Sequence, residues 1–301
     1  MALFINDEVI SLKNSIELYN SDSTNENNNN NIIDILKSIT IKVENDEKIQ
    51  QELNKSELIT ILMSLLSIHN KKPISDDNED TSNNEHGLTT EDNWKLSILT
   101  NNYNTDLDNI GNWNNIRDLI MLLLVKLCRR SIDKSTSCIA NIESIANYID
   151  LLVATFWVML NSESGSLACC WLVMILASDS NDRQRSLGKS KASEIIIAMM
   201  HRYKRIPINA EFACRAVRNL AADDDVAVQL VDDGICDVIA SLININNDNA
   251  DVILAAFWAI INLSCDSNVS TLLGSAGCCD SVVNASFKIV ADTEGKKYFI
   301  S

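Results

Sequence analysis

The segment RAVRNLAADDDVAVQLVDDGICDVIASL (residues 215–242) places an asparagine, Asn219, inside an apolar run with helical spacing. The segment WAIINLSCDSNVSTLLGSAGCCDSVVNAS (residues 258–286) repeats this arrangement around Asn262, 43 residues further along the chain. Asparagine is a poor helix former because its amide competes with the backbone for hydrogen bonds. Its recurrence at one position therefore indicates a structural repeat.

The same pattern extends to earlier parts of the chain. Gly234 and Gly277 keep the offset of 43 residues, and Lys191 takes their place when the segment 171–200 is aligned. The segment 43–66 also aligns without gaps. Glycine has no Cβ and so allows a sharp turn between two helices. A period near 43 residues with helical content is typical of HEAT and armadillo arrays.

Composition favours helices and argues against several classes of partner. Only 2 prolines and 8 glycines occur in 301 residues, and 46% of the residues are hydrophobic, which suits a helical protein with a large core. The net charge of −16 disfavours nucleic acid and anionic membranes as partners and favours a basic protein segment, although solubility alone would also explain it. We expect no membrane span, because no uninterrupted apolar run reaches about 18 residues, and no secretory signal.

The nine cysteines indicate a reducing compartment rather than a metal site or a catalytic site. They lie inside apolar helical runs, no C-x-x-C spacing occurs, and the three histidines are scattered. We therefore expect small buried hydrophobic residues, no metal site, no cofactor, and a cytoplasmic location with the nucleus as the alternative. The nine are Cys128, Cys138, Cys169, Cys170, Cys214, Cys236, Cys265, Cys278 and Cys279.

The quoted segments resemble the armadillo repeat family. The family pattern has an apolar third helix ending in Asn-Leu-Ala or Asn-Leu-Ser, a polar linker, a short first helix, a glycine turn and a second helix. Residues 215–242 and 258–286 carry these features in this order, and the resemblance is best over 165–290. It implies an all-α fold, a right-handed armadillo-like α-solenoid in which three-helix repeats stack into a superhelix.

Interruptions of the pattern divide the rest of the chain. Residues 20–31 are rich in asparagine and residues 71–92 are polar, acidic and turn-rich, so neither has much to bury. The predicted order is a capping helix at 1–19, an Asn-rich linker at 20–31, a first repeat at 32–70, an acidic mobile loop at 71–92 and one continuous array of repeats over 93–301, with an irregular connection at 101–115.

The resemblance also implies a peptide-binding groove. In armadillo arrays the third helices lie side by side on the concave face, and one Asn in each repeat offers its amide to an extended peptide backbone. A large side chain four residues before each Asn shares its helix face. The partner-binding residues implied in this way are Trp171, Arg215, Asn219, Trp258 and Asn262.

Structural explanations stay open for the same residues. The amides of Asn219 and Asn262 could instead tie adjacent helices together, and Trp171 and Trp258 could be ordinary core residues. Arg215 could lie on a solvated face. The acidic run 223–225 follows a third helix, where we expect it to cap the next helix.

The leading functional hypothesis is a non-catalytic scaffold or adaptor that captures a protein or an extended, basic peptide segment in the groove. One alternative is a regulator or exchange factor of a small GTPase or an Hsp70-type chaperone. Another is a nuclear-import-type cargo adaptor, because the pair Trp258 and Asn262 is similar to the one that import adaptors use for basic cargo. The chain lacks a glycine-rich phosphate loop, G-x-S-x-G and H-E-x-x-H, so we expect no enzyme.

The C-terminal end of the array is expected to lack a third helix. The pattern predicts a short first helix after Asn268, a turn at Gly277 and a second helix to about Val290. An apolar strip is then left open unless residues 298–300 fold back over it, and self-association or a partner is the alternative cover. The strip consists of Cys279, Val282, Val283, Phe287 and Ile289.

Overall fold

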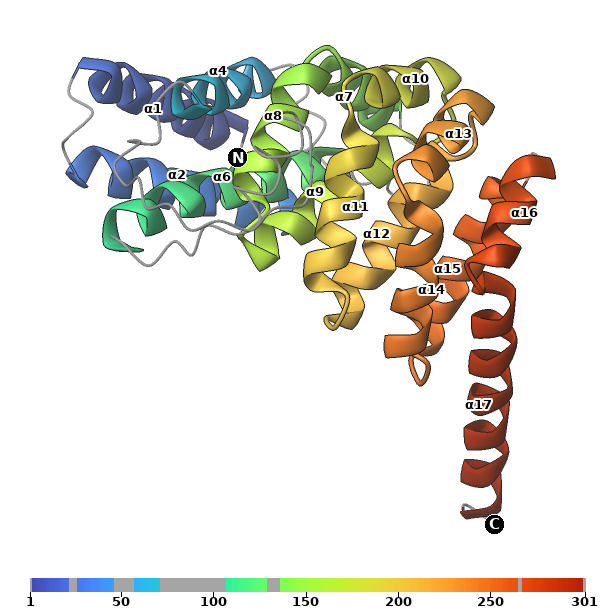
Figure 1. Ribbon diagram of the computed structural model, residues 1–301. Helices are drawn as coiled ribbons and strands as arrows, with labels where there is room; N and C mark the ends of the chain where they lie inside the picture. Colours follow the sequence, from blue (N-terminus) through green and yellow to red (C-terminus); the bar gives the residue numbers. More distant parts are fainter. Residues whose placement is uncertain are drawn as a thin grey trace, which may run out of the picture.

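The computed structural model describes residues 2–21, 26–45, 57–70, 107–128, 136–264 and 267–299, and every regular element in these ranges is an α-helix (Figure 1). The first helices of the repeats are α7 (Thr136–Ala146), α10 (Asn181–Lys189), α13 (Asp224–Asp232) and α16 (Ser267–Ser275). The second helices are α4 (Leu58–Asn70), α8 (Ile149–Met159), α11 (Ala192–Tyr203), α14 (Ile235–Ile245) and α17 (Cys278–Phe299). The third helices are α2 (Glu26–Asn45), α6 (Leu107–Cys128), α9 (Glu163–Leu176), α12 (Pro207–Leu220) and α15 (Ala250–Leu263), and α1 (Ala2–Ser21) precedes them all. The predicted all-α solenoid is confirmed.

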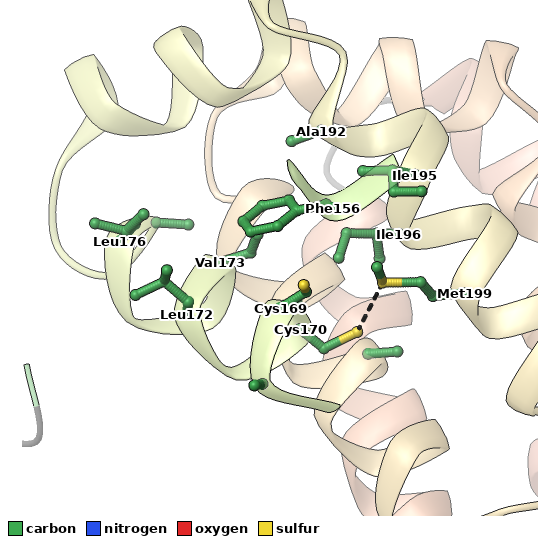
Figure 2. Packing of buried hydrophobic residues seen from close by; sticks show 14 of the residues in the cluster. Phe156, Cys169, Cys170, Leu172, Val173, Leu176, Ala192, Ile195, Ile196 and Met199 are labelled. Carbon is green, nitrogen blue, oxygen red and sulfur yellow. Dashed lines mark hydrogen bonds between the residues drawn. The ribbon is translucent and has the colours of Figure 1, made fainter. Parts of the chain in front are cut away.

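Helices of the same kind stack on one another along the array. The third helices α2, α6, α9, α12 and α15 pack in succession, and the second helices α4, α8, α11, α14 and α17 form a parallel row. At the N-terminal end α1 packs against α2 and α4. One hydrophobic core runs between the rows. Figure 2 shows part of it, where Phe156 of α8, Leu172 of α9 and Ile196 of α11 lie close together, all fully buried.

Local sequence signals account for the turns. The backbone is left-handed at Gly234 (φ 88°) and Gly277 (φ 76°), and Lys191 adopts the same conformation (φ 63°) at the aligned position. Asp223 caps α13, where its side chain accepts a hydrogen bond from the backbone N–H of Val226. The predicted turns and the predicted cap are therefore confirmed.

Polar side chains connect each repeat to the one before it. The hydroxyl of Tyr203 donates to the carbonyl oxygen of Leu160 at 3.0 Å. The amide of Asn246 donates to the carbonyl oxygen of Lys204 at 2.8 Å. Such bonds satisfy carbonyl groups at helix ends, which have no partner within their own helix. The repeats are thus joined by directed hydrogen bonds as well as by apolar packing.

Two segments that were predicted to be irregular are helical. The linker prediction for 20–31 was wrong at both ends, because α1 runs to Ser21 and α2 begins at Glu26. The irregular connection over 101–115 was wrong from Leu107 onward, where α6 begins. Once apolar residues such as Ile32 and Ile33 hold a helix against the core, adding weak helix formers to its end costs little. The acidic loop predicted at 71–92 lies outside the described residues.

The last helix is longer than predicted. α17 continues to Phe299 instead of ending near Val290, and it extends away from the stacked helices (Figure 1). The chain therefore does not turn back toward the array before Phe299. Val283 and Phe287 are exposed, with exposed fractions of 50% and 72%, so this part of the predicted apolar strip is confirmed. The side chains of residues 289–299 lie outside the described part of the structure.

The cysteines follow the prediction with one exception. Six of the seven that the structure describes are buried, whereas Cys279 is exposed, so the expectation of a buried thiol was wrong there. Its counterpart one repeat earlier, Cys236, is buried. The side chains of Cys138 and Cys265 lie outside the described residues. The difference arises because Cys279 belongs to the last repeat, where no further helix covers this position among the described residues.

Within the described ranges, no single helix has both the length and the apolar composition needed to span a membrane. Only α7 and α8 taken together meet these criteria, and they meet at an angle of 80°.

Candidate protein-binding face of the third helices

The five residues implied by the armadillo resemblance all lie on third helices. We call the surface that carries Trp171, Arg215, Asn219, Trp258 and Asn262 the third-helix face. Trp171 lies on α9, Arg215 and Asn219 on α12, and the other two on α15. Because α9, α12 and α15 pack in succession, the predicted residues belong to three neighbouring helices.

The two asparagines make equivalent bonds to the preceding repeat. The Nδ2 group of Asn219 donates to the carbonyl oxygen of Met174 at 2.7 Å, and that of Asn262 donates to the carbonyl oxygen of Arg218 at 2.7 Å. Both acceptors lie in the last turn of the preceding third helix, where carbonyl groups lack a partner in their own helix. The amides therefore tie adjacent helices together, and the two side chains share one orientation in the repeat.

The amides retain an acceptor for an external group. A carboxamide oxygen can accept hydrogen bonds independently of the NH₂ group. Among the described residues, no donor bonds to the Oδ1 atom of Asn219 or Asn262. Both side chains are half-buried. The bonds between helices thus use the NH₂ group of each amide and leave its oxygen available to a peptide N–H.

An aromatic and cationic cluster lies between α9 and α12, the helix that carries Asn219. The ring of Trp171 packs against Phe212 of α12, with 4.8 Å between the ring centroids. The guanidinium carbon of Arg215 lies 5.8 Å from the centre of the Phe212 ring, and its Nη2 atom is 2.6 Å from Oε1 of Glu211. Arg215 is therefore positioned by an aromatic contact and an ion pair rather than left fully solvated.

A second aromatic and cationic pair lies between α12 and α15. The guanidinium carbon of Arg218 lies 5.2 Å from the centre of the Trp258 ring. Phe257 packs against the edge of the same ring at 6.5 Å. Trp258 is 43% exposed, so it is a surface residue and not an ordinary core residue. An aromatic face that attracts a cation is thus already occupied by a residue of this chain.

A cavity of about 440 Å³ opens between α2, α6 and α9. Its walls are largely apolar, and Lys37 and Asp118 are the charged residues that line it. The lining residues are Lys37, Asp118, Leu119, Leu122, Ser164, Leu167, Ala168 and Trp171. A concave, mostly apolar site with a few polar groups is the usual form of a binding pocket. Trp171 therefore joins this cavity to the aromatic cluster on α12.

The carboxylate of Asp118 is held by hydroxyl groups. The hydroxyls of Ser162 and Ser164 each donate to its Oδ2 atom at 2.9 Å. Burial raises the pKa of Asp118 above its ordinary value, while the hydrogen bonds from Ser164 and Ser162 and the nearby charge of Arg117 oppose that change. Asp118 is thus a partly desolvated carboxylate at the wall of an apolar cavity.

The sequence pattern predicted only part of this surface. It identified Trp171 as a candidate at the edge of the groove, but it gave no indication of the cavity, of Asp118 or of Phe212. The cavity forms, with Asp118 in its wall and Phe212 beside Trp171, only because α2, α6, α9 and α12 stack. No spacing along the chain predicts these contacts between helices. The cavity could have been suspected from Leu122, which the repeat alignment places at the position of Trp171.

The described residues contain no cluster of three or more side chains suited to a metal ion. Burial raises the pKa of the Cys170 and Cys214 thiols to about 12, so neither is a nucleophile near neutral pH.

Comparisons with known proteins identify the fold. No protein-family model matches the chain, and no curated protein matches it in sequence. Solved structures of designed armadillo repeat proteins do match. One is 13% identical with a TM-score of 0.59, and the match covers 95% of this chain and 98% of the other.

A second designed armadillo repeat protein, solved in complex with the peptide (KR)4, is 13% identical with a TM-score of 0.56 and coverage of 94% and 98%. An engineered protein of the Northeast Structural Genomics Consortium is 12% identical with a TM-score of 0.59 and coverage of 90% and 88%. At this level of identity the likeness concerns the fold. Together with the stacked three-helix repeats, these matches show that the chain has an armadillo-like fold.

Proposed function

We propose that the third-helix face binds an extended segment of a partner protein, and that the chain acts as a non-catalytic scaffold or adaptor in the cytoplasm. The observation that carries this proposal is the cavity beside Trp171, which opens on the same row of helices as the amides of Asn219 and Asn262. A pocket of about 440 Å³ can take a large side chain of such a segment.

The groups on this face suit a peptide in extended conformation. The two Oδ1 atoms can accept from backbone N–H groups of the peptide, and they recur at the spacing of one repeat. Trp171 and Leu122 offer apolar area for a side chain, and the rings of Trp171 and Trp258 lose little conformational entropy on binding. Fixed polar groups would set the register, while the cavity would supply the anchor.

Part of the third-helix face is positively charged, although the net charge of the whole chain is −16. Arg215 and Arg218 are both exposed on α12, and a basic segment would be repelled there. Asp118 lies at the other end of the face, where a cationic side chain would find a carboxylate. The designed protein solved with (KR)4 makes that peptide a suitable basic probe, and an acidic peptide of equal length is its counterpart.

Selection of peptides from a displayed library, followed by calorimetric titration, tests the proposal. We expect selected peptides to bind with micromolar affinity and to lose about tenfold or more of it in the variants Trp171→Ala and Trp258→Ala. The control variant Val158→Ala removes an exposed apolar side chain from the second-helix row and should change the affinity by less than about twofold. Failure to select any peptide, or equal binding by all variants, would contradict a role for this face.

A further inference from the structure

The outer side of the last repeat carries an uncovered apolar surface. Leu254, Phe257, Trp258 and Ile261 of α15 are exposed, as are Val283 and Phe287 of α17. We call these six residues the end face. They are six of the thirteen large apolar side chains that are exposed in the described residues, and α15 and α17 pack against each other. Exposed apolar residues are therefore concentrated on α15 and α17, which lie at the C-terminal end of the array (Figure 1).

Two of the six positions are buried one repeat earlier, whereas the positions of Trp258, Ile261 and Phe287 correspond to Arg215, Arg218 and Asn244, which are exposed. Phe257 is 43% exposed, whereas Cys214, 43 residues before it, is 0% exposed beneath α15. Val283 is 50% exposed, whereas Ala240 is 7% exposed beneath α17. At Phe257 and Val283 the end face thus continues the surfaces on which one repeat packs the next. Among the described residues, no further third helix packs against α15, and α17 runs straight past the place where the chain would turn to form one.

We infer that a second copy of this chain docks on the end face and forms a two-fold symmetric dimer. A two-fold interface brings the same surface of each copy together, so the surface has to complement itself. The strip on α15 meets this condition. Its four residues have the spacing i, i+3, i+4, i+7, which places them on one side of the helix.

This spacing is symmetric about the point between Phe257 and Trp258. In an antiparallel pair of α15 helices, Leu254 meets the partner's Ile261, and Phe257 meets the partner's Trp258. The single charged residue of α15, Asp251, then lies opposite the partner's Ser264, so no carboxylate faces another carboxylate. The pairing joins the apolar side chains of the strip at its centre, as in stable interfaces.

The area of the end face approaches the area that a stable dimer buries. The six large side chains are about half exposed, and each would lose roughly 100 Å² of accessible surface in the dimer. Roughly 600 Å² of apolar surface per copy is therefore buried before the rim is included. Stable interfaces bury about 800 Å² per partner. The dimer also shields Trp258, so self-association is to be measured in the absence of peptide.

The oligomeric state of the 301-residue chain tests the inference. Light scattering after size exclusion, over a broad concentration range, should give twice the 33.4 kDa of one chain. The variants Phe257→Asp and Phe287→Asp should each raise the dissociation constant by about a hundredfold or more, because a charge is buried without a partner. The control Val228→Asp places the same charge at an exposed apolar position of α13 and should change it by less than about twofold.

Circular dichroism confirms that each variant is folded, and Phe287→Asp covers the case in which Phe257→Asp does not fold, since Phe287 is 72% exposed. A wild-type chain that stays monomeric at every concentration would overturn the inference. So would a dimer that persists unchanged in both aspartate variants.

Disulfide trapping tests the antiparallel pairing itself. In a background in which serine replaces Cys138, Cys265 and Cys279, an equal mixture of the variants Leu254→Cys and Ile261→Cys should give a disulfide-linked dimer. Within one chain these positions are about 10 Å apart along the helix, beyond the reach of a disulfide, which needs Cα atoms within about 7 Å. Each variant alone should cross-link far less than the mixture. Equal cross-linking of the mixture and the single variants would exclude the antiparallel arrangement.

Discussion

Replacing the repeat asparagines by alanine tests whether their amides hold adjacent repeats together. Asn219→Ala removes the bond of 2.7 Å to the carbonyl oxygen of Met174 and leaves that helix-end carbonyl without its donor in a partly buried place. Asn262→Ala removes a bond of the same length to Arg218, but at a solvent-exposed contact where water can replace the amide. The two variants therefore delete the same interaction in different surroundings.

The structure predicts different magnitudes. A net hydrogen bond contributes about 1 kcal/mol, and leaving a desolvated group unpaired adds about 1 kcal/mol. We expect Asn219→Ala to lower the free energy of unfolding by about 1–2 kcal/mol and Asn262→Ala by about 0.5 kcal/mol. Alanine is a better helix former than asparagine, which offsets part of the loss in both variants.

Asn244→Ala is the matched control. Asn244 is the penultimate residue of α14, as Asn219 and Asn262 are the penultimate residues of α12 and α15. It is exposed and has no hydrogen-bond partner among the described residues. The control therefore carries the gain in helix propensity without the loss of a bond, and the difference from it isolates the contribution of the inter-repeat contact.

Urea unfolding followed by far-UV circular dichroism measures these differences. Because repeat arrays can unfold in more than one step, the first transition of each variant is compared with that of the wild type. Asn219→Asp keeps the shape and the acceptor but loses the donor, so it should destabilise the protein more than Asn219→Ala. If Asn219→Ala unfolds like Asn244→Ala, or if Asn262→Ala costs more than Asn219→Ala, the amides do not act as inter-repeat ties.

Three further outcomes follow from local geometry. Lys191→Gly should raise the free energy of unfolding by about 0.5–1 kcal/mol, because it relieves a left-handed residue (φ 63°), whereas Gly234→Ala at φ 88° should lower it by about 1 kcal/mol, both measured by urea unfolding. Cys279 should react with a bulky thiol reagent before any buried cysteine, since burial raises the pKa of Cys170 to about 12; labelling of Cys170 at a similar rate would contradict this. The raised pKa of Asp118 means that its contribution to stability is present below the unfolded pKa and is lost as pH rises through the folded pKa. Thermal melting between about pH 4 and 7 should therefore show a decline in the wild type relative to Asp118→Asn, and parallel curves would refute it.

The repeat register could be predicted from the sequence because it depends on local preferences. A left-handed backbone favours glycine, so Gly234 and Gly277 predict the turns, and the alignment transfers that conformation to Lys191. Asp223 predicts a helix start because a carboxylate can bond to N–H groups within its own turn. These signals are contained in a few neighbouring residues, and they determine the repeat register, whereas the armadillo-like array was predicted from the resemblance of the repeats to that family.

The helix ends were harder to predict. The asparagines at the start of α2 and the residues before Ile116 in α6 have weak helix propensity, yet both segments are helical. The α17 helix likewise continues beyond Val290. Packing of the apolar part of a helix stabilises its extension, and this contribution comes from other helices rather than from the segment itself.

Only the tertiary structure decided which partners the repeated side chains have. The sequence determined that Asn219 and Asn262 are equivalent, but the direction of their amides depends on how closely the third helices stack. The same stacking brings Asp118 and Trp171 to one cavity and leaves Phe257 exposed where Cys214 is buried. A sequence records preferences along the chain, whereas contacts between repeats depend on the distance and rotation between packed helices, and these are set by all of their side chains at once.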